Sequence, residues 1–351
     1  MGVDVYQVTK DITCLQAPSA TGPYLSLWAR VRGFSPDALM KELYHSRRLV
    51  KIKCMRGDLF IVPLDLVEAT IAATRDQFSN NDLAKIYHAM ARTVQKTNGE
   101  PNPFEASENE LEEHKKSITE LLERECLTIE QLKKKLATRV NVSYIIYALC
   151  DSHILIRGPT VRWDNNKHRY TAWRNWLPGL TIRMTKEEAQ TVLIMNYIKT
   201  YGPVSLEDIV WWTGFTREDT VKKLKELADQ TVEISIDCFE GKFILTKDHL
   251  ARLKLVKFLD EPLVNFLPSQ DNYIVAYRKR SRHSLRDIYH KIHDRAGNVL
   301  PVVLVDGQVE GTWDYVNGKV EHTLFEKLDT GADYAVKLKA RSLGDFLKAH
   351  L

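Results

Sequence analysis

Apolar residues recur at helical spacing and then at alternating positions within residues 127–173. Thr128 can cap a first helix, and a second helix is predicted over residues 142–149 after a short break. Two strands follow, over residues 154–157 and 168–173, with a polar loop between them. Helix, turn, helix and β-hairpin in this order are typical of a winged helix.

The segment 186–245 repeats this order. It opens with a predicted helix over residues 186–199, and Ser205 with Asp208 resembles a capping box at the start of the next helix. That helix ends at Gly214, a residue type that helix-turn-helix units often use at this point. The remaining elements are a helix capped by Thr216 and two strands over residues 232–236 and 242–245. A further winged helix is therefore predicted.

The first hundred residues contain a less complete version of the same unit. A helix over residues 35–44 leads into a strand over residues 49–53. The tight turn Arg56-Gly57-Asp58 and a returning strand over residues 59–62 give a hairpin with the proportions of a wing.

The last hundred residues are richer in predicted strands. Asp306-Gly307 is a strong hairpin signal between strands over residues 299–305 and 309–315, and Asn317-Gly318 marks another turn. An earlier strand is predicted over residues 273–277, and a short amphipathic helix over residues 340–351.

Together these patterns predict an α+β protein made of tandem winged helices with a small C-terminal β-rich domain. The predicted domains are an N-terminal winged-helix-like domain (1–105), a second winged helix (106–180), a third winged helix (181–250) and the β-rich domain (251–351).

The composition fits a folded protein of several domains. The chain has 351 residues, of which 44% are hydrophobic and 27% charged, and these fractions exclude a disordered, collagenous or coiled-coil chain. No apolar run is long enough to span a bilayer, and the first residues do not read as a signal peptide. The five cysteines form no Cys-x-x-Cys pair, so reduced thiols in a cytoplasmic protein are expected, close to the nucleoid if the source is a prokaryote.

The small net charge of +4 conceals a strong partition of charge along the chain. Residues 101–130 carry a net charge of −6, whereas residues 41–60 and 139–175 each carry +4 and residues 251–300 carry +5. Either the basic blocks share one cationic face that binds DNA, or each block is simply a solvated surface.

Several common catalytic motifs are absent. The sequence has no phosphate-cradling glycine-rich loop, no dinucleotide fingerprint, no His-Glu-x-x-His and no Gly-x-Ser-x-Gly. His290 and His293 could share a helix face, but no third ligand is near, so a solvated or core pair is favoured over a metal site. We expect neither a metal nor a small-molecule cofactor.

The predicted architecture favours DNA as the partner. A helix-turn-helix places its second helix in the major groove, and a wing can reach phosphate. However, the helix over residues 142–149 is mostly apolar and aromatic, which is unlike a base-reading helix, and winged helices also serve as protein-interaction modules. The side chains of the wing over residues 154–173 that suit contact with the DNA backbone are Arg157, Arg162, Lys167, His168 and Arg169.

Three stretches of the sequence resemble one family. They are Cys14-Leu15-Gln16-Ala17 with the following residues 23–34, the segment 47–63 with Met55-Arg56-Gly57-Asp58, and residues 267–280 with 302–313. In this order they are similar to the winged-helix DNA glycosylases of the AlkZ and YcaQ type, over nearly the whole chain. The resemblance implies a set of tandem winged helices closed by a small β domain, and metal-independent excision of alkylated purines, including N7-alkylguanine and interstrand crosslinks.

The resemblance also implies a catalytic signature, Gln-x-Gln or Gln-x-Asp, in which a side chain holds the water that attacks C1′. Gln16 matches the first position, whereas Pro18 stands at the second and offers neither a polar side chain nor an N–H. Asp271 either supplies the missing carboxylate or is a cap or turn residue. Gln16 in turn either holds the water or makes an ordinary hydrogen bond between N-terminal segments.

The segments that carry the resemblance also contain candidate contacts to the DNA backbone. Arg56 either contacts phosphate or forms an ion pair within its hairpin, and Trp28 and Trp313 are expected in the core. The preferred phosphate contacts near the end of the predicted strand 273–277 are Arg278, Lys279, Arg280 and Arg282. The sequence thus predicts a monofunctional glycosylase acting on damaged double-stranded DNA, or alternatively a non-catalytic DNA-binding protein in which Pro18 marks the loss of chemistry.

Overall fold

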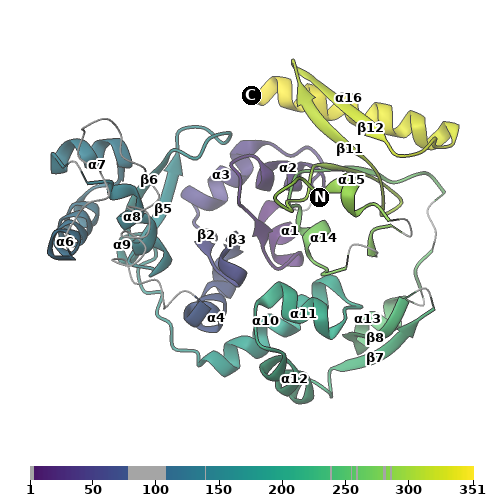
Figure 1. The fold of residues 1–351 in the computed structure, drawn as a ribbon, viewed down its shortest axis with the longest axis horizontal. Coiled ribbons are helices and arrows are strands. Elements are labelled where there is room, and N and C mark those ends of the chain that lie inside the picture. The colour runs from purple at the N-terminus through teal and green to yellow at the C-terminus, as the bar shows by residue number, and fades with distance from the viewer. Residues whose placement is uncertain are drawn as a thin grey trace. The chain divides into compact units, whose positions relative to one another are not determined.

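The computed structural model describes residues 4–77 and 108–351, apart from residues 139, 238, 254, 258–259, 280–281 and 285–286. The chain divides into two compact units. Unit 1 comprises Met1–Leu39 and Gln190–Leu351, and unit 2 comprises Met40–Ala189. Both units combine helices with small antiparallel sheets, so the predicted α+β class is confirmed (Figure 1).

Unit 2 begins with a hairpin that follows helix α3 (Pro36–Tyr44), which crosses from unit 1. Strand β2 (Leu49–Lys53) pairs with β3 (Leu59–Pro63), and the 3-10 turn η1 (Met55–Gly57) joins them, as the sequence predicts. Gly57 has a φ of 81°, in the left-handed region that glycine adopts without strain. Helix α4 (Leu64–Thr74) and the turn η2 (Arg75–Gln77) complete this part.

The rest of unit 2 contains the predicted helix-helix-hairpin order. Its elements are α6 (Glu108–Arg124), β4 (Leu127–Thr128), α7 (Ile129–Leu136), α8 (Val142–Asp151), β5 (Leu155–Thr160), β6 (His168–Ala172) and α9 (Trp173–Trp176). Thr128 accepts a hydrogen bond from the Gln131 amide while the Gln131 side chain accepts one from Thr128, so a complete capping box starts α7. Ile145 and Ile146 of α8 are fully buried, which explains the apolar character of this helix.

The middle of unit 1 contains the second helix-helix-hairpin segment. Its elements are α10 (Lys186–Tyr201), whose first turn lies in unit 2, α11 (Leu206–Thr213), α12 (Arg217–Glu226), β7 (Thr231–Ile236), β8 (Phe239–Thr246) and α13 (Lys247–Leu253). Ser205 and Asp208 form the predicted capping box, and Gly214 ends α11 in the left-handed conformation with a φ of 70°. Tyr197 and Trp212 pack together in the core, with ring centroids 4.9 Å apart.

The C-terminal part of unit 1 is a four-stranded sheet in the order β12-β11-β10-β9. Its strands are β9 (Val264–Leu267), β10 (Val302–Val305), β11 (Gln308–Val316) and β12 (Lys319–Leu324). The predicted turns at Asp306-Gly307 and Asn317-Gly318 are confirmed, because all four residues have positive φ. Helix α16 (Thr330–His350) packs along β9 and β12 (Figure 1).

Two elements of this part differ from the sequence prediction. Residues 273–277 do not form a strand: α14 (Asn272–Val275) is a helical turn, because Asp271 accepts a hydrogen bond from the Tyr273 amide and caps it. The C-terminal helix starts at Thr330 rather than at residue 340, because Asp329 caps it and its first half buries Ala332 and Val336 among polar neighbours.

The N-terminal elements of unit 1 are α1 (Val5–Asp11), β1 (Leu15–Gln16), α2 (Gly22–Trp28) and the start of α3. They belong to the same unit as residues 190–351, far along the chain. Tyr201 of α10 donates a hydrogen bond to the Ile12 carbonyl at 3.1 Å, which ties α10 to the end of α1. This association positions β1 and α2 against α14.

Candidate functional site

Asn272 anchors the strand that carries Gln16. The Gln16 amide donates a hydrogen bond to Asn272 Oδ1 at 2.7 Å, and Asn272 Nδ2 donates to the Cys14 carbonyl at 2.6 Å. A second donation from Asn272 Nδ2 reaches the hydroxyl of Tyr201 at 3.2 Å. One side-chain amide therefore holds the backbone on both sides of Leu15, and the Gln16 residue is only 6% exposed.

Asp271, the neighbour of Asn272, forms a buried ion pair with Arg30. Arg30 Nη2 donates to Asp271 Oδ1 at 2.6 Å and Arg30 Nη1 to Oδ2 at 2.8 Å, a bidentate arrangement. The Ser26 hydroxyl donates to Oδ2 at 2.6 Å and the Tyr273 amide to Oδ1 at 2.9 Å. The Asp271 side chain has no exposed surface, and its two oxygens accept four hydrogen bonds in total, which uses their ordinary acceptor capacity.

The ion pair keeps both groups charged. Burial by itself would raise the pKa of Asp271, but the attraction and hydrogen bonds of Arg30, with those of Ser26 and Tyr273, hold that pKa below its usual value. Burial likewise opposes the charge on Arg30, and Asp271 outweighs it, so the pKa of Arg30 is raised. An aspartate of lowered pKa is a poor proton acceptor, so this carboxylate suits charge and geometry rather than general base chemistry.

The structure thus brings the two predicted catalytic residues together, although 255 positions separate them in sequence: Gln16 contacts Asn272, which directly follows Asp271. Asp271 is the cap of α14, the alternative that the sequence left open. Pro18 is exposed, two residues beyond Gln16. Arg30, Ser26 and Asn272 were assigned no role from the sequence, although all three lie in the stretches that carry the family resemblance.

The basic residues predicted in unit 2 divide into exposed and enclosed groups. Arg162 is exposed and paired with Asp164 through two hydrogen bonds of 2.8 Å, and Lys167 and Arg169 are also exposed. Arg157 is enclosed, with 10% of its side chain exposed, and lies 3.9 Å from Asp151. Arg56 pairs with Asp58 at 3.0 Å, which is the ion pair that the sequence offered as the alternative to phosphate contact.

The basic residues near the end of α14 that were predicted to bind phosphate are likewise partly exposed and partly enclosed. Arg278 and Lys279 are exposed, and Arg280 lies outside the described residues. Arg282 is held in an aromatic cage, with its guanidinium 4.7 Å from the ring centre of Tyr277, 5.4 Å from Phe239 and 5.2 Å from Phe243. It also donates to the Pro203 carbonyl at 2.7 Å, so it connects β8 and the α10–α11 loop to the residues after α14.

Replacing Arg282 by leucine is expected to lower stability by about 1–3 kcal/mol, since a cation–π contact and a charged hydrogen bond are lost. Replacing the exposed Lys279 by leucine is the matched control and is expected to leave stability within about 0.5 kcal/mol. Urea denaturation of both variants measures this. A larger loss for the Lys279 variant would contradict the assignment of Arg282 to a structural cage.

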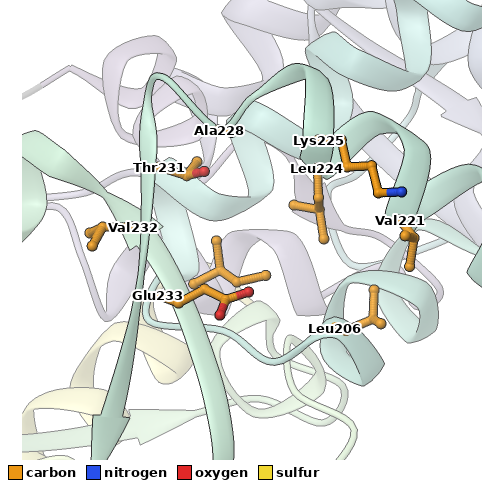
Figure 2. A pocket seen from close by; sticks show the side chains of 9 residues that line it. Leu206, Val221, Leu224, Lys225, Ala228, Thr231, Val232 and Glu233 are labelled. Carbon is orange, nitrogen blue, oxygen red and sulfur yellow. The ribbon is translucent and has the colours of Figure 1, made fainter.

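A pocket of about 440 Å³ lies elsewhere in unit 1, between α11, α12 and the hairpin β7–β8. Figure 2 shows apolar side chains such as Leu206, Val221 and Leu224 around it, with Lys225 and Glu233 as its charged members. None of the predicted site residues line this pocket. In the described part of the chain, no group of three or more His, Cys, Asp or Glu side chains is placed to hold a metal.

His290 and His293, the histidine pair considered from the sequence, both contact Tyr289. The His293 ring stacks on Tyr289 with centroids 4.0 Å apart, and His290 meets the same ring edge-on at 5.6 Å. Trp313 is buried as predicted and donates to the Leu267 carbonyl at 2.8 Å. No helix within the described ranges combines the length and the apolar character that crossing a membrane requires.

Comparisons with known proteins show which fold and family the chain shares. The solved structure of the DNA glycosylase AlkZ of Streptomyces sahachiroi superposes with a TM-score of 0.74 at 17% identity, over 98% of this chain and 91% of that one. A curated interstrand DNA cross-link repair glycosylase from the same organism is 27% identical over 142 residues, which span 40% of this chain and only 38% of that relative. The family described as DNA glycosylase AlkZ-like matches residues 9–346. The chain therefore belongs to the AlkZ-like DNA glycosylase family.

Proposed function

We propose that this protein is a metal-independent, monofunctional DNA glycosylase that hydrolyses the N-glycosidic bond of alkylated purines, of the N7-alkylguanine type or bulkier and crosslinked. Membership of the AlkZ-like family over residues 9–346 supports a glycosylase. The relative from Streptomyces sahachiroi bears the name of a cross-link repair enzyme. The observation that carries the proposal is the anchoring of Gln16 by Asn272 beside the buried Arg30–Asp271 pair.

Hydrolysis of the N-glycosidic bond of such a purine needs only modest catalysis by the protein. An N7-alkylated purine is cationic, so the C1′–N9 bond can break with its electron pair moving to N9, leaving an oxocarbenium ion at C1′. The side-chain carbonyl of Gln16 would accept a hydrogen bond from a water whose oxygen then bonds to C1′. Gln16 is neutral, so the proton of that water passes to solvent. Holding the water in place is a positioning effect of the kind that enzymes use widely.

Asp271 acts in this proposal as a positioning residue. Its oxygens are occupied by Arg30, Ser26 and the Tyr273 amide, so it fixes the turn from which Asn272 reaches Gln16. Because its pKa is lowered, it stays charged across the working range of pH. The activity should therefore show no titration step from Asp271 above about pH 4.

The two helix-helix-hairpin segments would serve as tandem winged helices that hold double-stranded DNA, within the four domains predicted from the sequence. Exposed cations on them and after α14 would contact phosphate. The exposed candidates are Arg162, Lys167, Arg169, Arg278 and Lys279. Each such contact releases counterions, so binding should weaken steeply with salt.

A second candidate is a DNA-binding protein of the same fold without catalysis. The observation that favours it is Pro18, which stands exposed where the family signature has a Gln or Asp and cannot bind water through a side chain. This candidate predicts salt-dependent binding of duplex DNA without base release.

The wild-type protein is expected to release 7-methylguanine from a duplex that contains one such base. The measurement is strand cleavage after base treatment of the abasic site, with a lesion-free duplex and an enzyme-free reaction as controls, and with EDTA added in a parallel reaction. Absence of cleavage for several alkylated purines, together with retained salt-dependent binding, would favour the non-catalytic candidate. Absence of binding at low salt would remove both.

A further inference from the structure

Lys51, on strand β2 of unit 2, is a buried lysine without a carboxylate partner. The residue is 9% exposed, and in the described part of unit 2 no acidic side chain forms an ion pair with it. An ammonium group taken out of water normally acquires an opposite charge or hydrogen-bond acceptors. Its neighbour Lys53 follows that rule, with Nζ 2.7 Å from Asp151 Oδ2.

Arg157 adds a second positive charge beside Lys51. Strand β5, which carries Arg157, packs against β2 in unit 2. The Arg157 side chain is only 10% exposed, and its guanidinium lies 5.8 Å from the ring centre of Tyr147 and 3.9 Å from the Asp151 carboxylate. Lys51 and Lys53 are two residues apart on β2 and so lie on the same face of the strand, and Lys53 and Arg157 both approach Asp151. Burial, with repulsion from Arg157, lowers the pKa of Lys51 to about 8.

His168, on strand β6, lies close enough to the same two cations to be affected by their charge. Its Nδ1 lies 3.2 Å from the Gly158 carbonyl, to which it donates, so Nε2 faces away from that bond. Burial and the charges of Lys51 and Arg157 lower the pKa of His168 to about 3, so the ring is neutral near pH 7. The other ionisable groups that interact around this space are Lys53, Tyr147, Cys150, Asp151 and Tyr170.

Among the described side chains named here, Lys51, Lys53 and Arg157 are cationic and Asp151 is acidic. Asp151 is already bonded to Lys53, so the positive charges outnumber the negative one. From this geometry we propose that Lys51 and Arg157 form a binding site for a phosphate group near His168. A phosphate oxygen can accept a hydrogen bond from the ammonium group while the planar guanidinium binds a second oxygen.

The phosphate group can come from two sources, the DNA backbone or a free or terminal phosphate. The site itself does not depend on glycosylase activity, and only its DNA source rests on the proposed function. Phosphate binding and base release are therefore measured separately, and one can fail without the other.

The first experiment measures the melting temperature of the full chain in inorganic phosphate at pH 7, with sulfate and chloride at the same ionic strength as controls. Phosphate at about ten times its Kd is expected to raise the melting temperature of the wild type by about 2–5 °C more than the other salts do. Lys51→Met and Arg157→Gln should abolish this increment. Lys133→Met, at an exposed lysine of α7, should keep it.

The pH dependence gives an independent readout. Because Lys51 loses its proton above about pH 8, the phosphate increment should be smaller at pH 9.5 than at pH 7 in the wild type. Lys51→Met replaces an unpaired buried charge by an apolar chain of similar length, so it should fold, and circular dichroism checks this. Arg157→Lys is a second variant that keeps the charge. No phosphate-specific increment in the wild type, or an equal increment in folded Lys51→Met, would overturn the site.

The second experiment identifies the source of the phosphate. With an undamaged duplex, Lys51→Met is expected to weaken binding and to reduce the slope of log affinity against log salt by about 1 if the site holds the DNA backbone. An unchanged slope, with the phosphate increment present in the wild type alone, would assign the site to a free or terminal phosphate.

Discussion

Replacing Asp271 by alanine is expected to lower the free energy of unfolding by about 3–5 kcal/mol, because the Arg30 guanidinium then stays enclosed without its carboxylate. The substitution also removes the cap of α14 and the acceptor of the Ser26 hydroxyl. Urea denaturation measures the loss. The double variant Arg30→Met with Asp271→Leu, which removes both charges, should recover a large part of it.

Asp329→Ala is the matched control. Asp329 is an exposed aspartate that caps α16 through the Ala332 amide at 2.9 Å, as Asp271 caps α14. Losing this cap alone should cost about 1 kcal/mol. If Asp271→Ala costs no more than Asp329→Ala, the ion pair does not stabilise unit 1.

The effect of Asp271 should depend on pH in a fixed direction. Its folded pKa lies below the value of 3.8 for an ordinary aspartate. The stabilisation is therefore fully present above about pH 4 and declines as the pH falls through the lower folded-state pKa. The difference in stability between wild type and Asp271→Ala should shrink in the same range.

Replacing Gln16 by alanine is expected to lower the rate of base release about 10²–10³-fold while affinity for duplex DNA changes by less than about twofold. The reason is that alanine removes the amide that would hold the water, but leaves the backbone N–H that binds Asn272. Single-turnover rates with a 7-methylguanine duplex, and gel shifts with the same duplex, provide the two readouts.

Gln7→Ala is the control, since Gln7 is an exposed glutamine that binds Asp11 on α1. It should leave both readouts unchanged. A Gln16→Ala rate equal to that of the wild type would move the chemistry to another residue. Pro18→Asp, which rebuilds the family signature at an exposed position, is expected to raise the rate, and an unchanged rate would mean that one polar residue suffices.

The sequence predicted the local units of this fold better than their packing. Thr128 with Gln131 and Ser205 with Asp208 are capping signals that need only neighbours three residues away, and both capping boxes are present. Residues 273–277 were misassigned as a strand because their side chains have high strand propensity. The cap at Asp271 outweighs that propensity.

The candidate site could be predicted only in part. Gln16 and Asp271 were recognised through the family resemblance, but the bond from Gln16 to Asn272 spans 256 positions and that from Arg30 to Asp271 spans 241. Such pairs have no local signal. The same limit explains Arg282, which charge alone suggested as a phosphate contact and which the fold encloses in an aromatic cage.

The discontinuous make-up of unit 1 has a consequence for synthesis of the chain. Residues 40–189 form unit 2 as one continuous stretch, so they can fold while the ribosome is still making the rest. The strand with Gln16 emerges first, yet its anchor, Asn272, is made more than two hundred residues later. A nascent or prematurely terminated chain that ends before residue 272 therefore carries Gln16 without the hydrogen bonds of Asn272. Only a chain translated past this point can assemble the site.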